Sequence, residues 1–253
     1  MKTNDPVGVI PATEIYDGVR LSTDMAPEIG TMSAPKGVAL VLHGFDLMKN
    51  HQPGQALLVA VDWLRFKLEK QGYQVIFGRY NTHQSFVFGA QEIAAYLKNN
   101  KVPTSNLSIF AYSMGGLVAR QMIANGLKPR RLFTYCTPHL GTMLHVPPIN
   151  NGAMSMMPVS QDLGKLNKNT TEAAFRSNVT AIGFSHANPS PQLHDGVVDI
   201  NSATGVGLGF GRPVHWLSMR VGPQLPLDPH GAVQNLPDIE PALAMFAGDV
   251  LKG

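Results

Sequence analysis

Short runs of apolar residues without alternation recur along this chain. Residues 38–42 read Val-Ala-Leu-Val-Leu, and comparable runs occupy residues 73–77, 107–112, 131–136, 179–184 and 213–221. Strands that are buried on both faces, as in a parallel sheet, have this unbroken pattern. The runs therefore predict a mostly parallel central sheet, and residues 15–21 are a candidate for one further edge strand.

A different pattern lies between these runs. Leu57, Val61, Leu64 and Leu68 recur at steps of three and four residues, which gives one apolar face on a helix over residues 53–71. Pro53 suits the first helical position and Gly72 the end. Further helices are expected over residues 85–99, after Ser113 and from about residue 237. The alternation of strands and helices predicts an α/β fold with helices on both faces of the sheet.

The length of 253 residues fits one domain, so residues 1–253 are predicted to form a single unit. Residues from about 143 to 176 interrupt the strand–helix alternation and carry several methionines and prolines. We expect a helical insertion there. The glycine-rich residues 205–211 lack the lysine of a phosphate-binding loop and predict a surface loop.

The most informative stretch is residues 107–120, an apolar strand that runs into a helix with Ser113 between them. Ala111 lies two residues before this serine and Gly115 two residues after it. This is the nucleophile-elbow pattern, in which the turn is so tight that only small neighbours fit and the serine backbone is strained. The competing interpretation is a serine that only caps the helix.

Residues 111–120, Ala-Tyr-Ser-Met-Gly-Gly-Leu-Val-Ala-Arg, resemble the elbow of bacterial lipases and esterases of the α/β-hydrolase superfamily, including its alanine variant. Three more segments match in order: residues 41–45 (Val-Leu-His-Gly-Phe), 136–142 (Cys-Thr-Pro-His-Leu-Gly-Thr) and 195–198 (Asp-Gly-Val-Val). The resemblance extends from about Gly37 to the C-terminus. It implies the α/β-hydrolase fold, with a cap or lid formed by the insertion at about 143–176.

The resemblance also implies roles for individual residues. Ser113 is the expected nucleophile, and the backbone N–H groups of Phe45 and Met114 are the expected oxyanion hole. Asp195 matches the acid of the catalytic triad, with Asp199 as the second candidate. His43 is expected to brace its loop.

Three histidines compete for the role of catalytic base. In this superfamily the order along the chain is nucleophile, acid, histidine, and His139 precedes the acid. His215 falls at the start of the last strand, whereas His230 follows that strand and precedes the final helix. His230 is therefore the predicted base, and His139 is predicted to be structural.

The predicted activity is that of a serine carboxylic-ester hydrolase, which forms an acyl-enzyme on Ser113 and uses no metal and no organic cofactor. One alternative is an acyltransferase with the same triad, and another is a non-catalytic α/β-hydrolase that only binds a ligand. Amide hydrolysis on the same triad also stays open. The methionines of the insertion either pack on the core or line an acyl pocket.

Composition and charge limit the classes of binding partner to expect. The net charge is only +3 and the basic residues are scattered, so nucleic acid is not an expected partner. A small-molecule or lipid ester is the expected substrate, with a transient lipid interface possible. The single cysteine, Cys136, lies in an apolar strand and is expected to be buried. Residues 1–6 lack the apolar core of a signal peptide, which predicts a cytoplasmic protein, or a secreted one if the natural chain begins earlier.

Overall fold

The structure, a computed structural model, describes residues 9–11, 35–45, 55–142, 150–188, 194–221 and 236–252. In these residues seven strands form one sheet in the order β1-β3-β2-β4-β5-β6-β7. Strands β2 to β7 are parallel, and β1 pairs antiparallel with β3 at one edge. The mostly parallel sheet predicted from the apolar runs is confirmed.

The strands are β1 (Val9–Pro11), β2 (Val38–Leu42), β3 (Gln74–Gly78), β4 (Leu107–Tyr112), β5 (Arg131–Tyr135), β6 (Val179–Asn188) and β7 (Arg212–Val221). Strand β6 continues four residues beyond its predicted end, because β7 pairs with it along nearly its whole length. The candidate edge strand at residues 15–21 lies outside the described residues.

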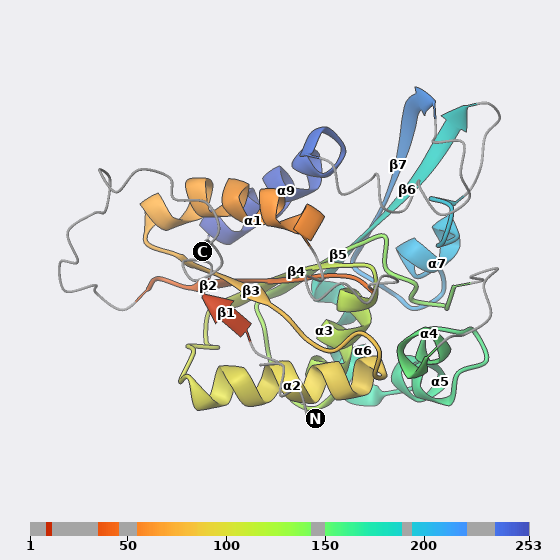
Figure 1. Cartoon of the computed structure of the whole chain (residues 1–253), viewed down its shortest axis with the longest axis horizontal. Helices are drawn as coiled ribbons and strands as arrows, with labels where there is room; N and C mark the ends of the chain where they lie inside the picture. Colours follow the sequence, from red (N-terminus) through yellow and green to blue (C-terminus); the bar gives the residue numbers. More distant parts are fainter. Residues whose placement is uncertain are drawn as a thin grey trace, which may run out of the picture.

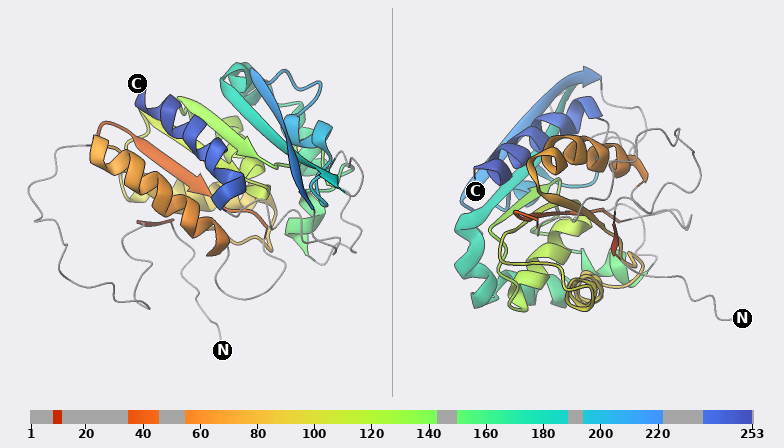
Figure 2. Two further views of the ribbon diagram at one scale, coloured as in Figure 1. Left: turned by 90° about the horizontal axis from the view of Figure 1, so that it is seen from above. Right: turned by 90° about the vertical axis from the view of Figure 1, so that its left-hand side faces the viewer.

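The helices are α1 (Gln55–Leu68), α2 (Phe86–Asn99), α3 (Met114–Ala124), α4 (Asn151–Ser155), α5 (Gln161–Asn167), α6 (Thr170–Phe175), α7 (Ile200–Thr204) and α9 (Leu236–Leu251), with short 3-10 turns η3 (Glu69–Gln71) and η4 (Arg176–Asn178). Helices α1 and α9 cover one face of the sheet, and α2, α3 and α6 lie on the other (Figure 1). Seen from above, α1 and α9 run side by side over the strands (Figure 2).

Two hydrophobic cores follow from the alternation of side chains along each strand. Leu40 and Leu42 of β2 point into the core beneath α2 and α3, whereas Ala39 and Val41 point into the core beneath α1 and α9. All four are at most marginally exposed. Because both faces of the central strands are covered, these strands carry no polar alternation.

The helix boundaries match the local signals. The Ser85 side chain accepts a hydrogen bond from the Phe88 N–H and caps α2. Gly72 follows η3 with a φ of 86°, a left-handed conformation that favours glycine. The four apolar residues predicted to form the inner stripe of α1 are fully buried.

Candidate active site

Ser113 stands between β4 and α3 in a backbone conformation that few side chains adopt. Its φ is 51° and its ψ is −124°. Among the described residues other than glycine, only Lys101 and Cys136 also have a positive φ. Such a conformation costs on the order of 1–3 kcal/mol and persists only where the surrounding structure enforces it. Here the Ser113 N–H donates to the Tyr135 carbonyl at 2.9 Å, which extends the β4–β5 pairing into the turn.

Two glycines allow the chain to pass close to this serine. A Cβ on Gly115 would lie 2.6 Å from the His43 carbonyl oxygen. A Cβ on Gly44 would lie 2.8 Å from the Cβ of Ser113. Real Cβ atoms essentially never approach other atoms this closely. A side chain at Gly115 would press on the backbone of β2, and one at Gly44 would press on the Ser113 and Tyr112 side chains. The structure thus brings together two segments that the sequence analysis assigned to one site.

His43 braces the segment beside the serine. It is fully buried, and its Nδ1 lies 2.8 Å from the Gly44 carbonyl while its Nε2 accepts from the Tyr80 N–H at 3.3 Å. The Tyr80 hydroxyl donates to the His43 carbonyl at 2.6 Å, and the two rings stack at 4.4 Å. Burial lowers the pKa of His43 to about 4, a hydrogen bond to Gly44 opposes this shift, and Arg79 adds to it. The imidazole is therefore neutral, which agrees with the predicted structural role.

The two backbone N–H groups predicted for the oxyanion hole flank this serine. Phe45 directly follows Gly44, and Met114 is the first residue of α3. Neither N–H donates to any acceptor in the described part of the chain. The start of a helix also carries partial positive charge. The oxyanion hole itself stays a prediction.

Asp195 and Asp199 have different environments. Asp195 is fully buried, and one of its carboxylate oxygens accepts from the Val197 and Val198 N–H groups at 3.0 and 2.8 Å. Asp199 is exposed, and its side chain caps α7 by accepting from the Asn201 N–H at 2.8 Å. The structure therefore gives Asp199 a structural role and leaves Asp195 as the candidate acid.

Cys136 lies next to this carboxylate. It is buried, as expected, directly after β5 with a φ of 52°. Burial raises the pKa of its thiol well above the usual range, and the nearby Asp195 carboxylate raises it further. Because Tyr135 of β5 pairs with Tyr112 of β4, Cys136 is level with Ser113 on the neighbouring strand. The Asp195 carboxylate is thus held at the same end of the sheet as the serine.

His139 belongs to a buried polar cluster beneath α3. Its Nε2 lies 2.9 Å from the Thr134 hydroxyl, and its Nδ1 lies 3.3 Å from a nitrogen of the Arg120 guanidinium. Burial lowers its pKa well below the usual range, and the charges of Arg120 and Arg176 act in the same direction. These contacts agree with the predicted structural role.

Phe210 completes this cluster, with its ring at 4.7 Å from the His139 ring. The glycine-rich segment is therefore not only a surface loop, because Phe210 anchors it in the core.

The position of His215 corrects the sequence analysis. It does not lie at the far end of the sheet, because it pairs with Gly183 of β6 and so lies level with Ser113 across the strands. It is nevertheless three strands away, about 14 Å at the usual spacing of ~4.8 Å. Its Nε2 lies 2.6 Å from the Ser185 hydroxyl. Lateral separation, not strand direction, argues against His215 as the base.

His230, the predicted base, lies outside the described residues, so its position relative to Ser113 and Asp195 stays a prediction.

The insertion at about 143–176 contains α4, α5 and α6 in its described part. Helices α5 and α6 pack against α3. Met156 is buried and Met154 is exposed, whereas Met143 lies outside the described residues. A cavity of about 530 Å³ lies between the start of α2 and this insertion. Met154 and Met157 line it, but none of the predicted catalytic residues does. The cap function and the acyl pocket stay predictions.

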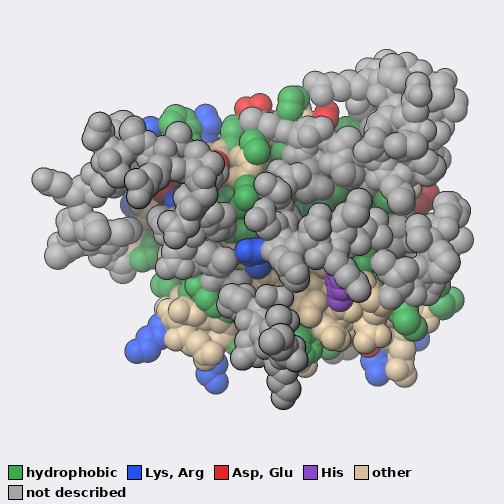
Figure 3. All heavy atoms as spheres, viewed as in Figure 1, with side chains coloured by type: hydrophobic (Ala, Val, Ile, Leu, Met, Phe, Trp, Pro, Cys, Tyr) green, Lys and Arg blue, Asp and Glu red, His purple; other side chains and the backbone are tan. Residues whose placement is uncertain are grey.

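The described residues contain no group of three or more His, Cys, Asp or Glu side chains that is arranged to hold a metal ion. In the same residues, no helix has the length and apolar character needed to cross a membrane. Lys and Arg side chains are dispersed over the described part of the face in Figure 3, without a continuous basic stripe.

A comparison with protein families matches residues 89–172 to the family described as "Putative serine esterase (DUF676)". The matched range includes α3 and Ser113 and ends before Asp195. No curated protein matches this sequence.

Several solved structures resemble this chain at low sequence identity. The mature lipase BlEst2 of Bacillus licheniformis has a TM-score of 0.53 at 13% identity, over 86% of this chain and 96% of the lipase. In the propeptide form of that lipase the match covers 83% of this chain but 50% of the lipase chain, so this chain spans half of it (TM-score 0.53, 15% identity).

The metagenome-derived lipolytic enzymes LipS and LipT give a TM-score of 0.50 at 14% identity, over 87% of this chain and 95% of the other. A structure of the N-acyl homoserine lactonase AidH gives a TM-score of 0.51 at 13% identity, over 86% of this chain and 93% of the lactonase chain. The chain has the α/β-hydrolase fold, and its resemblance to lipases and esterases is confirmed.

The sequence analysis missed Tyr80 as a brace of the site. Tyr80 lies two residues after β3, and no local pattern indicates that it reaches back to His43. The signal is tertiary, because strands β2 and β3 pair in parallel and their ends meet.

Proposed function

We propose that this chain is a serine carboxylic-ester hydrolase of the lipase and esterase type. The observation that carries the proposal is the conformation of Ser113, with a φ of 51° at the start of α3 and Gly44 in close contact. A serine that only caps a helix has an extended backbone, as Ser85 does before α2 with a φ of −60°. Strain of this kind is maintained at functional sites.

In the proposed reaction His230 acts as a neutral base. It takes the proton from the Ser113 hydroxyl while the serine oxygen forms a bond to the ester carbonyl carbon. Asp195 orients the imidazole and stabilises its charged form. The buried position of Asp195 supports this role, because two backbone N–H groups fix its carboxylate at the end of the sheet where Ser113 lies.

The tetrahedral intermediate carries a negative oxygen, for which the Phe45 and Met114 N–H groups are the proposed donors. Loss of one such donor costs about 2.7–4 kcal/mol of transition-state stabilisation in enzymes of this kind. The intermediate then expels the alcohol, which takes the proton from His230, and leaves the acyl group on Ser113. Water attacks the acyl-enzyme in the same way, releases the carboxylic acid and restores the serine.

We propose an apolar acyl group in the substrate, either of a small-molecule ester or of a lipid. The described part of the insertion supports this, because Met154 and Val159 are exposed there, at 52% and 87%. Two large apolar side chains on one short segment suit contact with an acyl chain or a transient lipid interface.

The test is hydrolysis of a series of p-nitrophenyl esters from acetyl to palmitoyl. Wild type, Ser113→Ala and a control, Ser105→Ala in an exposed turn, are compared after circular dichroism verifies that all are folded. We expect turnover by wild type and the control and none above background by Ser113→Ala. A fluorophosphonate probe should add its mass to wild type and not to Ser113→Ala.

Turnover retained by Ser113→Ala would overturn the proposal, as would a folded wild type that cleaves no ester and takes up no probe. Addition of an alcohol acceptor separates hydrolysis from acyl transfer, because an acyltransferase yields mainly the new ester.

A further inference from the structure

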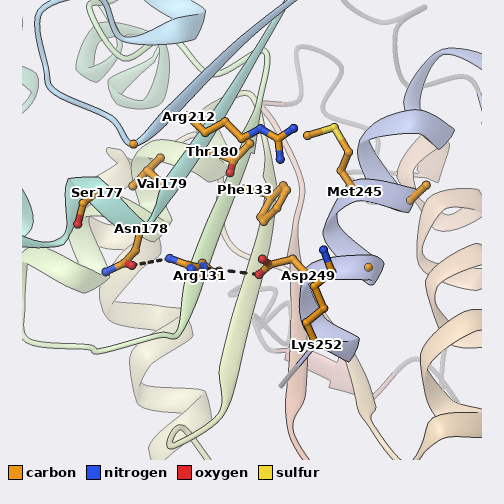
Figure 4. Close-up of a pocket in the computed structure, with 13 residues that line it drawn as sticks. Arg131, Phe133, Ser177, Asn178, Val179, Thr180, Arg212, Met245, Asp249 and Lys252 are labelled. Atoms are coloured by element: carbon orange, nitrogen blue, oxygen red, sulfur yellow. Dashed lines mark hydrogen bonds and ion pairs between the residues drawn. The ribbon is translucent and has the colours of Figure 1, made fainter.

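A cavity of about 460 Å³ opens at the amino ends of β5, β6 and β7 (Figure 4). Ser113 follows the carboxyl end of β4, so it lies at the opposite end of the parallel strands. The length of β5 separates the two ends of the strands by roughly 13 Å at ~3.3 Å per residue. The cavity is therefore distinct from the candidate active site.

One wall of the cavity is a row of side chains on the sheet. Phe133 pairs with Thr180, which in turn pairs with Arg212, so the three side chains lie next to one another on the same face. Arg131 precedes Phe133 by two residues and shares this face. The row combines a buried aromatic ring, a hydroxyl and two guanidinium groups.

The opposite wall is the last part of α9. Ala244, Met245, Gly248, Asp249 and Lys252 recur at intervals of three and four residues, which places them on one side of the helix. Gly248 and Ala244 have small side chains and leave space on this side of the cavity, whereas Met245 supplies an apolar surface. The lining thus combines two large apolar side chains, Phe133 and Met245, with charged and polar groups.

Positive charge is in excess there. Asp249 is the only carboxylate among the lining residues. It is shared by Arg130 and Arg131, whose nitrogens lie 3.4 and 3.7 Å from it, and Arg131 also donates to the Asn178 side chain. In the described part of the chain, neither Arg212 nor Lys252 has a carboxylate partner.

Only some of these basic side chains have an evident role in stabilising the fold. Arg130 donates to the Asp249 carbonyl, and Lys252 follows the last turn of α9, where basic groups offset the negative end of the helix dipole. Arg212 lies on β7, across the cavity from this helix end, and contributes nothing of that kind. Arg212 is therefore an exposed cation of the cavity wall without a carboxylate partner in the described residues.

We propose that this cavity binds a small organic anion, a carboxylate with a short apolar body. Arg212 and Lys252 hold the carboxylate, because a guanidinium matches its two oxygens. Phe133 and Met245 contact the apolar body. The volume lies within the usual range of ligand sites. The site does not depend on the proposed esterase activity.

The probe is 3-phenylpropanoate, with 3-phenylpropanamide as its neutral counterpart and inorganic phosphate as an anion without an apolar body. Binding to the full chain is followed by ¹H–¹⁵N NMR at low and high salt. We expect 3-phenylpropanoate to shift the signals of Gly211, Arg212 and Gly248 in a saturable way. Arg212→Gln should weaken binding about tenfold or more, as loss of a charge-assisted contact does, and high salt should weaken it too.

The matched control is Arg65→Gln, which removes an arginine from the exposed side of α1 and should leave binding unchanged. Equal binding of the amide, or unchanged affinity in Arg212→Gln, would overturn the proposal. So would signal shifts confined to residues near Ser113. Phosphate binding as tight as that of 3-phenylpropanoate would overturn the role assigned to Phe133 and Met245.

Discussion

The Arg120 guanidinium and the Glu172 carboxylate form an ion pair in which neither side chain is more than 1% exposed, with Nε and Oε1 2.8 Å apart. Arg120 lies on α3, seven residues after Ser113, and Glu172 lies on α6 in the insertion. The Glu172 carboxylate also binds Arg176 at 2.7 Å, and Arg120 donates to the Asn167 side chain. The pair therefore fastens the insertion to the helix that carries the candidate nucleophile.

Replacement of Glu172 by glutamine should be strongly destabilising. It leaves the buried Arg120 cation without its counter-charge, and loss of one partner of a buried pair costs about 3–5 kcal/mol. Glu69→Gln is the control, because it breaks the exposed Arg65–Glu69 pair and should cost less than about 1 kcal/mol. Urea unfolding of the three proteins measures both values, and equal losses would contradict the argument from burial.

Gly115→Ala should disrupt the site. Its Cβ would meet the His43 and Leu42 carbonyl oxygens at 2.6 and 2.9 Å, and neither backbone group has room to move. We expect a loss of about 1–3 kcal/mol from overpacking, together with loss of esterase activity. Gly164→Ala in α5 is the matched control, because nothing lies within 4 Å of its Cβ. It should stabilise the protein by about 0.5–1 kcal/mol. A harmless Gly115→Ala would refute the close approach of the two segments.

His43 should make the stability depend on pH below neutrality. Its pKa is about 4 in the folded protein and 6.5 when unfolded, so between these values only the unfolded chain takes up the proton. The contribution is complete above pH 6.5 and is lost as the pH falls towards 4. The stability advantage of wild type over His43→Gln should thus be about 2–3 kcal/mol smaller at pH 4.5 than at pH 7.5. Urea unfolding at both pH values tests this, and a constant difference would contradict the shifted pKa.

Substitution of the three histidines should separate their roles in ester hydrolysis. His230→Ala should reduce kcat by at least about 10³-fold, as loss of a triad base does. His215→Ala should retain most of the activity, because β5 and β6 separate this residue from Ser113. His139→Ala should lower stability more than kcat, because it removes a buried member of the Arg120 cluster. Steady-state kinetics at saturating ester decides between them, and an inactive His215→Ala beside an active His230→Ala would reverse the assignment.

Much of the fold follows from local pattern. The unbroken apolar runs predicted six of the strands, because a strand covered on both faces has no polar alternation. Strand β1 escaped prediction because Val9–Pro11 is too short to carry a pattern, and only its pairing with β3 defines it. The extension of β6 to Asn188 includes polar residues, and pairing with β7 keeps them extended.

The candidate site divides in the same way. Ser113 was identifiable because a tight turn restricts its immediate neighbours, so its signal lies within five residues. Asp195 and Asp199 were ambiguous, since a short acidic segment does not indicate which carboxylate is buried. The structure separated them through backbone hydrogen bonds to one and helix capping by the other.

The sequence by itself determined the parallel α/β architecture and the strained serine, because both depend on the periodicity and size of neighbouring residues. Only the tertiary structure decided which distant groups share an environment. Tyr80 meets His43, Glu172 meets Arg120, and Arg212 faces α9, each across strands or helices far apart in the chain. Burial and charge pairing at these contacts arise from packing of the whole sheet, which no local segment encodes.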